Sequence, residues 1–445
     1  MNHVEWNERE AKSLEVKVDP TFIASPEEID PENYIIATYY VESTYPTIKA
    51  GEQIAIEESI GTWTEVTTET EWIRKKLAAK VFQYENKNEG IVKVAFPLEL
   101  FDPEIGGIPN LLSTVAGNLF GLSPLKNCKL LDLEMPKEYV KVYPGPKIGL
   151  EGVRKIVGTL ENRRPHLGTI IKPKVGLNPE QTANVAYEAA MGGVDLIKDD
   201  ETLTNQKFCP IEERLTKVME KLDQVKEETG KTVLYALNIT ATYSKMLELA
   251  DMAIENGANC LMIDVLTTGF SAVQVLAEDP SIKVPLHIHR AMHAALTRNP
   301  KHGISMMVIA KLVRLAGGDQ LHTGTAAGKM GVKGEAKHIR KINDFLRSDW
   351  HGLKTLFPVA SGGIHPGIVP INVELLGKDI VINAGGGIHG HPWGTRAGAK
   401  AMRQAIEAVV KGISLEEYAK DHPELDAALK KWGQLYVEKA LANEQ

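Results

Sequence analysis

The sequence predicts an α/β protein in which a C-terminal (β/α)8 TIM barrel follows a small α+β, ferredoxin-like domain. Beyond about residue 147, short apolar segments recur eight times, at a spacing that accommodates a strand, a helix and two loops. The segments between them carry the apolar stripe of amphipathic helices. The short segments are apolar enough to be buried on both faces, as the strands of parallel sheets are. A doubly wound open sheet is the alternative, but eight units in one run favour a closed barrel.

The chain divides into three segments. Residues 1–30 are polar, contain Pro-Glu-Glu and Asp-Pro-Glu, and are expected to form an extended arm. Residues 31–146 interleave apolar runs of strand and helix type, which predicts the α+β domain. The stretch Tyr143–Gly149 has two prolines, two glycines and no periodicity, so we place the domain boundary there. Residues 147–445 are assigned to the barrel and its C-terminal helices.

Apolar periodicity and capping residues predict the individual elements. The first domain is expected to contain strands over 34–42, 61–66, 90–100 and 128–135 and helices over 71–80 and 108–121, with a polar turn after the first strand. In the barrel region, Asn178 and Pro179 suit the N-cap and first position of a helix, and Gly230 ends the apolar stripe that begins at Ile211. The barrel strands are predicted at Gly168–Lys172, Asp195–Asp200, Thr232–Ile239, Cys260–Val265, Pro285–Arg290, Gln320–Thr325, Phe357–Ser361 and Asp379–Ala384.

Composition excludes several classes of protein. The 445 residues are 43% hydrophobic and 24% charged, which is ordinary for a folded globular protein. A formal net charge of −7 and an isoelectric point near 6.1 give no reason to expect nucleic acid or an anionic membrane as a partner. The three cysteines are far apart and suit a reducing compartment. The sequence shows neither a signal-peptide pattern nor an apolar run of about 18 residues, so we expect a soluble, cytoplasmic protein.

The most informative motif is Lys-Asp-Asp-Glu, at the end of the second predicted barrel strand. Barrels place their active sites at the carboxyl ends of their strands. Side chains alternate along a strand, so Lys198 and Asp200 share a face, and Glu201 can turn inward as the strand ends. Two carboxylates at a barrel mouth indicate a hard cation such as Mg2+, and a carbamate formed from Lys198 and CO2 would supply a third anionic oxygen. A solvated charge run at a loop is the alternative.

Two further motifs carry cationic or metal-ligating side chains. Lys172 and Lys174 end the first strand, and desolvated lysines near a metal can donate protons to an enolate or hold a phosphate. A pair of surface lysines is the alternative. His287 and His289 form an HxH pair, as in zinc hydrolases built on barrels. That class expects HxH on the first strand and an aspartate closing the last, whereas here HxH lies on the fifth and the eighth ends at Asn383, so zinc is disfavoured.

Glycine-rich turns follow the last three strands. The turn after the sixth lacks a Walker pattern and carries Lys329, which favours a mobile lid over a nucleotide loop. An ordinary surface loop is the alternative. Ser361–Gly363 and Gly385–Gly387 follow the seventh and eighth strands, where barrels often bind phosphate through backbone N–H groups. The last turn also matches GxGxxG, but no further strand follows to complete a βαβ unit, so phosphate is favoured over NAD.

In order and residue type, these motifs resemble those of the RuBisCO large subunit, from about Tyr34 to the C-terminus. The segment GIHPG is similar to archaeal-type, form III-like members, and Asn383 stands where many members have Gln. The resemblance implies a ribulose-1,5-bisphosphate carboxylase/oxygenase that enolises ribulose 1,5-bisphosphate with Mg2+, adds CO2 or O2, and hydrolyses the carboxylated product to two 3-phosphoglycerates. It also implies a homodimer, or an assembly of dimers, without a small subunit.

The resemblance assigns roles to residues of the barrel. Lys198 is carbamylated and takes the C3 proton of the substrate, while Asp200 and Glu201 are Mg2+ ligands. Lys172 donates a proton late in the reaction and Lys174 supports it. The remaining residues contact the substrate: His289 near the sugar hydroxyls, Arg290 and His322 at one phosphate, Gly362, Gly363, Gly385 and Gly386 at the other, Ser361 at a hydroxyl, and Lys329 at the incoming carboxyl group.

Four residues of the first domain, Glu57, Thr62, Trp63 and Asn118, match family positions that complete the active site of a neighbouring subunit. One alternative is a RuBisCO-like sugar-phosphate enolase or isomerase, which needs the metal site but not the carboxylation machinery. The four matches, together with Lys329, disfavour it. The other alternative is a non-catalytic sugar-phosphate sensor, for which a complete set of lysines and carboxylates would be unnecessary.

Overall fold

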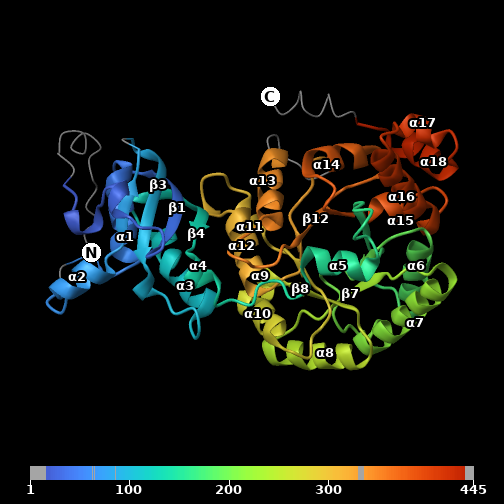
Figure 1. Cartoon of the computed structure of the whole chain (residues 1–445), viewed down its shortest axis with the longest axis horizontal. Helices are drawn as coiled ribbons and strands as arrows, with labels where there is room; N and C mark the ends of the chain where they lie inside the picture. Colours follow the sequence, from blue (N-terminus) through green and yellow to red (C-terminus); the bar gives the residue numbers. More distant parts are fainter. Residues whose placement is uncertain (1–16, 63, 65, 86, 329–334, 436–445) are drawn as a thin grey trace. The chain divides into compact units, whose positions relative to one another are not determined.

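The computed structural model describes residues 17–62, 64, 66–85, 87–328 and 335–435 (Figure 1). The chain forms two compact units. The first comprises the residues up to Tyr143 together with Met292–Leu312, and the second comprises Pro144–Ala291 and the residues from Val313 onward. The division falls at Tyr143, the first residue of the expected boundary segment. The stretch Met292–Leu312 was expected to belong to the barrel but groups with the first unit.

A five-stranded mixed sheet forms the first unit, in the order β10-β4-β1-β3-β2. β1 (Tyr34–Ser43) pairs antiparallel with β3 (Glu89–Pro97) on one side and with β4 (Leu125–Glu134) on the other. β2 (Lys80–Gln83) pairs antiparallel with β3, and β10 (Gly303–Ile304) pairs parallel with β4. The expected strands 34–42, 90–100 and 128–135 are therefore present. β2 was not predicted, because it is only four residues long and begins at Lys80, the last residue of the stretch expected to be helical.

Helices cover the sheet at positions that only partly match the sequence pattern. α1 (Thr47–Glu57) replaces the expected polar turn, since its buried residues Ala50, Ile54 and Ala55 form a narrow apolar stripe among polar residues. α2 (Glu71–Leu77) and α3 (Gly107–Val115) match the two expected helices. The described residues of 61–66 form no strand, so the strand expected there is wrong. The remaining helices are η3 (Leu98–Leu100), η4 (Leu119–Gly121), α4 (Lys137–Val140) and α11 (Ala294–Thr297).

The described part of the arm lies on the first unit. It contains two short 3-10 helices, η1 (Pro20–Phe22) and η2 (Pro26–Glu28), and the side chains of Phe22 and Ile29 are buried. Ile23 forms a parallel bridge with Val81 of β2, and the Ala24 amide donates to the Val81 carbonyl. Burial of its apolar residues thus fixes this segment against the edge of the sheet.

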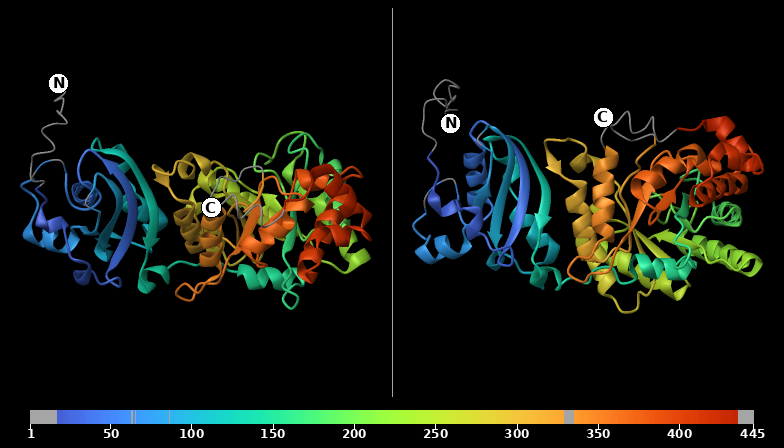
Figure 2. Two further views of the ribbon diagram at one scale, coloured as in Figure 1. Left: turned by 90° about the horizontal axis from the view of Figure 1, so that it is seen from above. Right: turned by 45° about the horizontal axis from the view of Figure 1, so that its top comes forward.

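The second unit contains a closed eight-stranded parallel barrel, in the order β11-β12-β13-β5-β6-β7-β8-β9, which confirms the predicted fold class (Figures 1 and 2). All eight strands lie within or next to their predicted ranges, because each is a short apolar run that ends at polar or glycine residues. Their bounds are β5 (His166–Ile170), β6 (Leu196–Lys198), β7 (Leu234–Asn238), β8 (Cys260–Asp264), β9 (Leu286–His289), β11 (Gln320–His322), β12 (Phe357–Ser361) and β13 (Val381–Asn383).

Helices surround the barrel, and the helix boundaries predicted at Asn178 and Gly230 are confirmed. The Asn178 side chain caps α6 by accepting from the Gln181 amide, and Gly230 ends α7 in the left-handed region. The second segment of the first unit ends within α12, at Leu312. The helices are α5 (Gly149–Val157), α6 (Pro179–Met191), α7 (Ile211–Thr229), α8 (Tyr243–Glu255), α9 (Val265–Thr268), α10 (Phe270–Glu278), α12 (Met306–Ala316), α13 (Glu335–Arg347), η5 (Pro366–Ile368), α14 (Val369–Leu376), α15 (Gly386–His389), α16 (Thr395–Lys411), α17 (Leu415–Ala419) and α18 (Pro423–Trp432).

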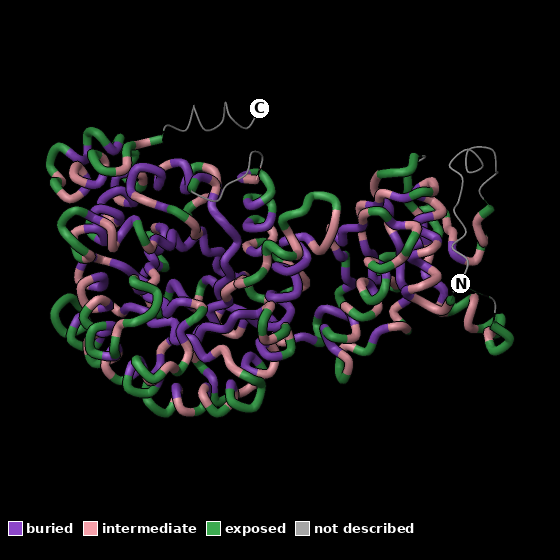
Figure 3. The backbone as a smooth tube through the Cα atoms, turned by 180° about the vertical axis from the view of Figure 1, so that it is seen from behind, coloured by how far each residue is buried: buried purple, intermediate pink, exposed green. Residues whose placement is uncertain are grey.

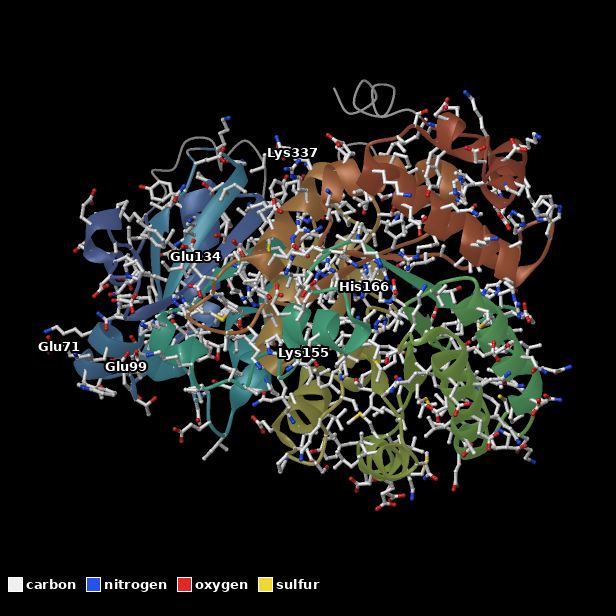
Figure 4. The ribbon with its side chains drawn as sticks, turned by 45° about the vertical axis from the view of Figure 1, so that its right-hand side comes forward. Glu71, Glu99, Glu134, Lys155, His166 and Lys337 are labelled. Carbon is white, nitrogen blue, oxygen red and sulfur yellow. The ribbon has the colours of Figure 1, made fainter. Side chains whose placement is uncertain are left out.

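The barrel interior is apolar at its base and polar where the strands end. Buried side chains such as Leu196, Ala236, Met262 and Val359 form one cluster, and Figure 3 shows the buried stretches gathered in the interior of this unit. His166, labelled in Figure 4 among the barrel elements, is 1% exposed. Because alternate residues of a strand face the same way, the next inward positions on these strands are Lys198, Asn238, Asp264 and Ser361. No helix among the described residues has the length and apolarity to cross a membrane.

Candidate active site

Lys198, the last residue of β6, is fully buried. Its Nζ donates to the Asp199 carbonyl oxygen at 2.7 Å and lies 3.7 Å from Glu201 Oε2. Burial lowers the pKa of Lys198, against the opposing effects of Glu201, Asp200 and Asp199. A lysine with a lowered pKa spends more time as the neutral amine, which is the form that reacts with CO2.

Asp200 is tied to the neighbouring strand end through Lys172. Lys172 Nζ lies 3.1 Å from Asp200 Oδ2, while the amide and hydroxyl of Thr202 donate to Oδ1. Burial raises the pKa of Asp200, but the hydrogen bonds from Thr202 and Lys172 outweigh it and lower the pKa. Asp200 is therefore a carboxylate at neutral pH, with a cation already beside it. Lys174 is exposed in the loop after β5.

Glu201, His289 and Asp264 form a third group at the same end of the barrel. His289 Nε2 lies 3.7 Å from Glu201 Oε2, and His289 Nδ1 lies 3.6 Å from Asp264 Oδ1. Burial raises the pKa of Asp264 to about 7, despite the lowering effect of Lys198. Asp264 Oδ1 has no hydrogen-bond partner among the described residues. Asp264 was expected near the end of a barrel strand, at the same mouth as Lys198, but no role was assigned to it from the sequence.

These side chains fit a hard cation. Asp200 and Glu201 supply two carboxylates, and the Asp264 oxygen that lacks a partner adds an acceptor nearby. Among the described residues, no three His, Cys, Asp or Glu side chains form a ready-made metal site. A carbamate on Lys198 would supply a third anionic oxygen beside Glu201, which is the arrangement expected from the sequence.

Behind the Lys-Asp-Asp-Glu run, three buried side chains hold the end of β6 in place. Asp199 faces away from Lys198 and accepts from the Tyr235 hydroxyl at 2.6 Å and from Arg214 Nη2 at 3.1 Å. Asp199 and Arg214 are both fully buried. Sequence reasoning missed this scaffold, because Arg214 lies on an amphipathic helix where an arginine is expected to face solvent.

The loop that carries Glu201 is fixed by Asn238, the last residue of β7. Its buried Nδ2 donates to the carbonyl oxygens of Glu201 and Leu203, at 3.2 and 3.0 Å. Arg214 Nη2 donates to the Thr204 carbonyl oxygen at 2.8 Å. Backbone and side-chain contacts from β7 and α7 thus preorganise both carboxylates.

On the opposite side of the barrel mouth, His322 joins β9 to β12. Its Nε2 lies 2.8 Å from His287 Nε2, and its Nδ1 lies 2.8 Å from Ser361 Oγ. The rings of His289 and His322 are packed edge to face, with centroids 4.6 Å apart. Both ring nitrogens of His322 are therefore engaged within the protein, and a direct bond to phosphate would require one of these contacts to break.

The glycine turns leave open backbone at the strand ends. Gly362 and Gly363, after β12, have φ values of +121° and +70°, which glycine adopts without strain. Gly385 precedes α15, and a Cβ placed there would lie 3.3 Å from Lys172 Cε. Gly386 has open space at the same position. Arg290 follows β9, and burial lowers its pKa to about 10.

In the first unit, the structure brings two of the four predicted residues together. Asn118 Nδ2 donates to Glu57 Oε1 at 3.2 Å. The neighbouring Glu58, which the sequence did not single out, accepts from the Asn118 and Gly117 amides at 2.8 and 3.1 Å. Thr62 is exposed and outside any helix or strand. Trp63 and Lys329 lie outside the described residues.

Two family models of known proteins match this chain, one in each of its two parts. Residues 152–432 match the family model of the ribulose bisphosphate carboxylase large chain, catalytic domain, and residues 25–139 match that of its N-terminal domain. The chain belongs to the RuBisCO large-chain family. Its archaeal character is also confirmed, since the ribulose bisphosphate carboxylase of Methanocaldococcus jannaschii is 50% identical over 402 residues, covering 86% of this chain and 93% of the relative.

Two solved RuBisCO structures show the same fold. The octameric ribulose-1,5-bisphosphate carboxylase/oxygenase of Pyrococcus horikoshii OT3, crystallised with sulfate, aligns with a TM-score of 0.87 and 44% identity, covering 94% of this chain and 98% of that one. The dimeric archaeal RuBisCO of Hyperthermus butylicus aligns with a TM-score of 0.84 and 40% identity, covering 92% and 98%. The predicted family, fold and archaeal type agree with these likenesses.

Proposed function

We propose that the chain is a ribulose-1,5-bisphosphate carboxylase/oxygenase whose catalytic groups lie at the mouth of the barrel. One observation supports the proposal most strongly. Lys198 is fully buried, its pKa is lowered, and its Nζ lies 3.7 Å from Glu201 among carboxylates. In its charged form, Lys198 would repel a metal ion bound by these carboxylates. In its neutral form, the Lys198 amine is a nucleophile that can react with CO2.

Activation forms the third anionic ligand. The Lys198 nitrogen attacks the carbon of CO2, one C=O electron pair moves onto oxygen, and the nitrogen loses a proton to solvent. The carbamate, Asp200 and Glu201 would then hold Mg2+, and Asp264 would add a further acceptor beside them. When bound, Mg2+ stabilises negative charge on the substrate oxygens.

The chain's own groups then move protons. In the enolisation step the carbamate of Lys198 takes the C3 proton of ribulose 1,5-bisphosphate. Lys172, held 3.1 Å from Asp200, donates a proton later in the reaction, with the exposed Lys174 assisting it. His289, which lies between Glu201 and Asp264, would contact the sugar hydroxyls. Lys329 would contact the incoming carboxyl group.

The two phosphates are assigned to neighbouring pairs of strands at the mouth. Arg290 and His322 would hold one, since they lie at the ends of the adjacent strands β9 and β11. Gly362, Gly363, Gly385 and Gly386 would hold the other, because their backbone N–H groups end β12 and begin α15 and no side chain blocks approach at Gly386. Ser361 would contact a substrate hydroxyl between them.

We further propose that active sites are completed by a second copy of the chain. The Glu57 and Asn118 pair lies on the first unit, and the resemblance assigns it, with Thr62 and Trp63, to the site of a neighbouring subunit. The relatives from Hyperthermus butylicus and Pyrococcus horikoshii are described as dimeric and octameric. A cytoplasmic location is also proposed, because Cys128, Cys209 and Cys260 are buried and unpaired.

Incorporation of 14C from bicarbonate into acid-stable product, in the presence of ribulose 1,5-bisphosphate and Mg2+, tests the proposal. A carboxylase yields labelled 3-phosphoglycerate. An enolase or isomerase would convert the substrate without fixing label, and a sensor would bind it unchanged. Either of these outcomes, obtained after preincubation with CO2 and Mg2+, would overturn the proposed function.

A further inference from the structure

The described residues that lead from β11 towards Lys329 are held by a side chain from another part of the barrel unit. Residues 325–328 belong to no helix or strand, so their backbone groups need partners outside regular structure. Asn372, the fourth residue of α14, supplies such partners. The roles proposed above do not use Asn372, and it lies in none of the motifs to which the sequence assigns a role.

The Asn372 amide is matched to this segment through both of its polar atoms. Its Oδ1 lies 2.6 Å from Thr325 Oγ1 and accepts from the Ala326 amide at 2.9 Å. Its Nδ2 donates to the carbonyl oxygens of Ala327 and Ile368, each at 3.0 Å. Because backbone N–H groups only donate and carbonyl groups only accept, these partners fix which end of the amide is oxygen and which is nitrogen. One side chain therefore ties three consecutive residues of the segment to α14.

Packing alone does not account for an asparagine at this position. Asn372 is fully buried, and its neighbours Val369, Ile371 and Val373 in α14 are buried apolar residues. A buried amide costs free energy unless its polar atoms are hydrogen-bonded, and here both are. A leucine of similar size would fill the space without that requirement. The amide is therefore explained by the contacts that it makes with residues 325–328.

The segment ends against a turn that the proposed function uses. A Cβ at Gly328 would overlap the carbonyl oxygen of Gly362, so this close approach requires glycine. Gly362 lies in the turn assigned to a substrate phosphate, and α14 follows the same turn along the chain. Asn372 thus holds the segment beside the phosphate turn, at the point where the chain continues into Lys329.

We propose that Asn372 is a positioning residue for the step in which Lys329 contacts the incoming carboxyl group. By fixing residues 325–328, Asn372 sets the point from which the chain enters Lys329, and it acts through this segment rather than on the substrate. Enolisation takes place at Lys198 before CO2 is added, so loss of the anchoring contacts should leave that step largely intact. This inference rests on the proposed function, which gives Lys329 its role.

Anchoring of the segment can be measured without substrate. In Asn372→Leu the amides of Ala326 and Ala327 lose their acceptor, and their hydrogen exchange should be at least about tenfold faster than in the wild type. The matched control is Asn343→Leu, which should leave this exchange unchanged. Asn343 is a fully buried asparagine of α13, beside α14 (Figure 1), and its side-chain amide has no hydrogen-bond partner among the described residues. Unchanged exchange in Asn372→Leu, or equal acceleration in both variants, would overturn the proposal.

Kinetics supply a readout that a packing role would not move. Carboxylation by Asn372→Leu, measured as 14C fixation, should fall about thirtyfold, because a small misplacement of a catalytic group is costly. Exchange of the C3 proton of ribulose 1,5-bisphosphate, measured with tritium, should stay within about threefold of the wild type. Lys329→Ala should show the same split to a larger degree, and Asn343→Leu should show none. A parallel loss of both activities in Asn372→Leu would indicate a general packing defect and refute the positioning role.

A second variant covers the case in which Asn372→Leu does not fold. Thr325→Val keeps the shape of the side chain and removes the hydroxyl beside Asn372 Oδ1. Its carboxylation should fall about threefold while its proton exchange stays at the wild-type rate. Equal loss of the two activities, or no loss of either, would contradict the proposal.

The substrate-free and kinetic measurements separate this inference from the function on which it rests. If the exchange of the Ala326 and Ala327 amides depends on Asn372 but the wild type fixes no label, anchoring of the segment stands and the proposed function falls. If the wild type carboxylates normally while that exchange is independent of Asn372, the function stands and the positioning role of Asn372 falls.

Discussion

The barrel mouth and the first unit hold their candidate residues in different ways. Lys198 and Asp200 are 0% and 2% exposed, and buried side chains from neighbouring strands fix them. Asn118 is exposed and Glu57 half-buried, and the pair is joined by one hydrogen bond at 3.2 Å. The barrel residues are therefore preorganised within one chain, while the pair on the first unit has open surroundings that another molecule can occupy.

Lys198→Ala should cause the largest loss. It removes the nucleophile for CO2 and the third anionic ligand, so we expect carboxylation and C3 proton exchange to fall together by at least about a thousandfold. The measurements are 14C fixation and tritium exchange from labelled ribulose 1,5-bisphosphate. Lys226→Ala, which removes an exposed lysine from α7, is the control and should retain full activity. Proton exchange that persists in Lys198→Ala would refute the assignment of Lys198 as the base.

Arg214→Met tests the buried scaffold behind the metal ligands. It leaves Asp199 buried without its ionic partner, which is expected to cost about 3–5 kcal/mol in the free energy of unfolding. Tyr235→Phe removes one hydrogen bond to the same carboxylate and should cost about 1–3 kcal/mol. Denaturant unfolding measures both, and Mg2+ titration of the folded CO2-treated protein should show weaker binding in each. Unchanged Mg2+ affinity in Tyr235→Phe would show that Asp199 does not position Asp200.

Asn118→Ala and Lys198→Ala together test whether a second chain completes the site. Each homodimer should be nearly inactive, but a mixed dimer has one site with both lesions and one with neither. Random pairing makes half of the dimers mixed, so coexpression should restore up to about a quarter of wild-type activity. If differently tagged subunits copurify as mixed dimers yet no activity returns, each site is built from one chain.

The smallest expected effect concerns Glu58. Its carboxylate accepts from the Asn118 and Gly117 amides, and Glu58→Ala would release the backbone on which Asn118 sits. Both amides lie on exposed residues and can bind water instead, so we expect a loss of only about 1 kcal/mol in stability and a few-fold rise in KM. The Glu58→Gln side-chain oxygen can still accept from one of the two amides, so its stability and KM should lie between those of the wild type and Glu58→Ala. A kcat loss as large as that of Asn118→Ala would mean that Glu58 acts directly on the substrate.

The same contrast explains which features were predictable from sequence. Barrel strands are short apolar runs that end in functional residues. A residue at the end of a predicted strand is therefore expected at the barrel mouth, as Lys198 and Ser361 are. The side-chain contacts between strands cannot be predicted in this way. Neither the link from Lys172 to Asp200 nor the contact between His322 and Ser361 has a sequence signature, because each joins side chains on two strands and depends on how those strands pair.

In the first unit the sequence pattern was weaker. α1 has only a narrow apolar stripe among polar residues, which does not distinguish it from a polar turn, and the strand expected over 61–66 does not form in the described residues. Glu58 gave no signal because a glutamate after a helix usually faces solvent, whereas here it is 7% exposed. Asn118 and Glu57 were identified only through the family resemblance.

The most direct test of the proposed site is detection of the carbamate itself. Wild-type protein equilibrated with 13CO2 should show one carbamate carbon signal per chain by NMR, and Mg2+ should lengthen its lifetime because Asp200 and Glu201 hold the cation beside it. The signal should be absent in Lys198→Ala and present in Lys226→Ala. No carbamate in the wild type, or an equal signal in Lys198→Ala, would contradict the assignment of Lys198 as the residue that completes the metal site.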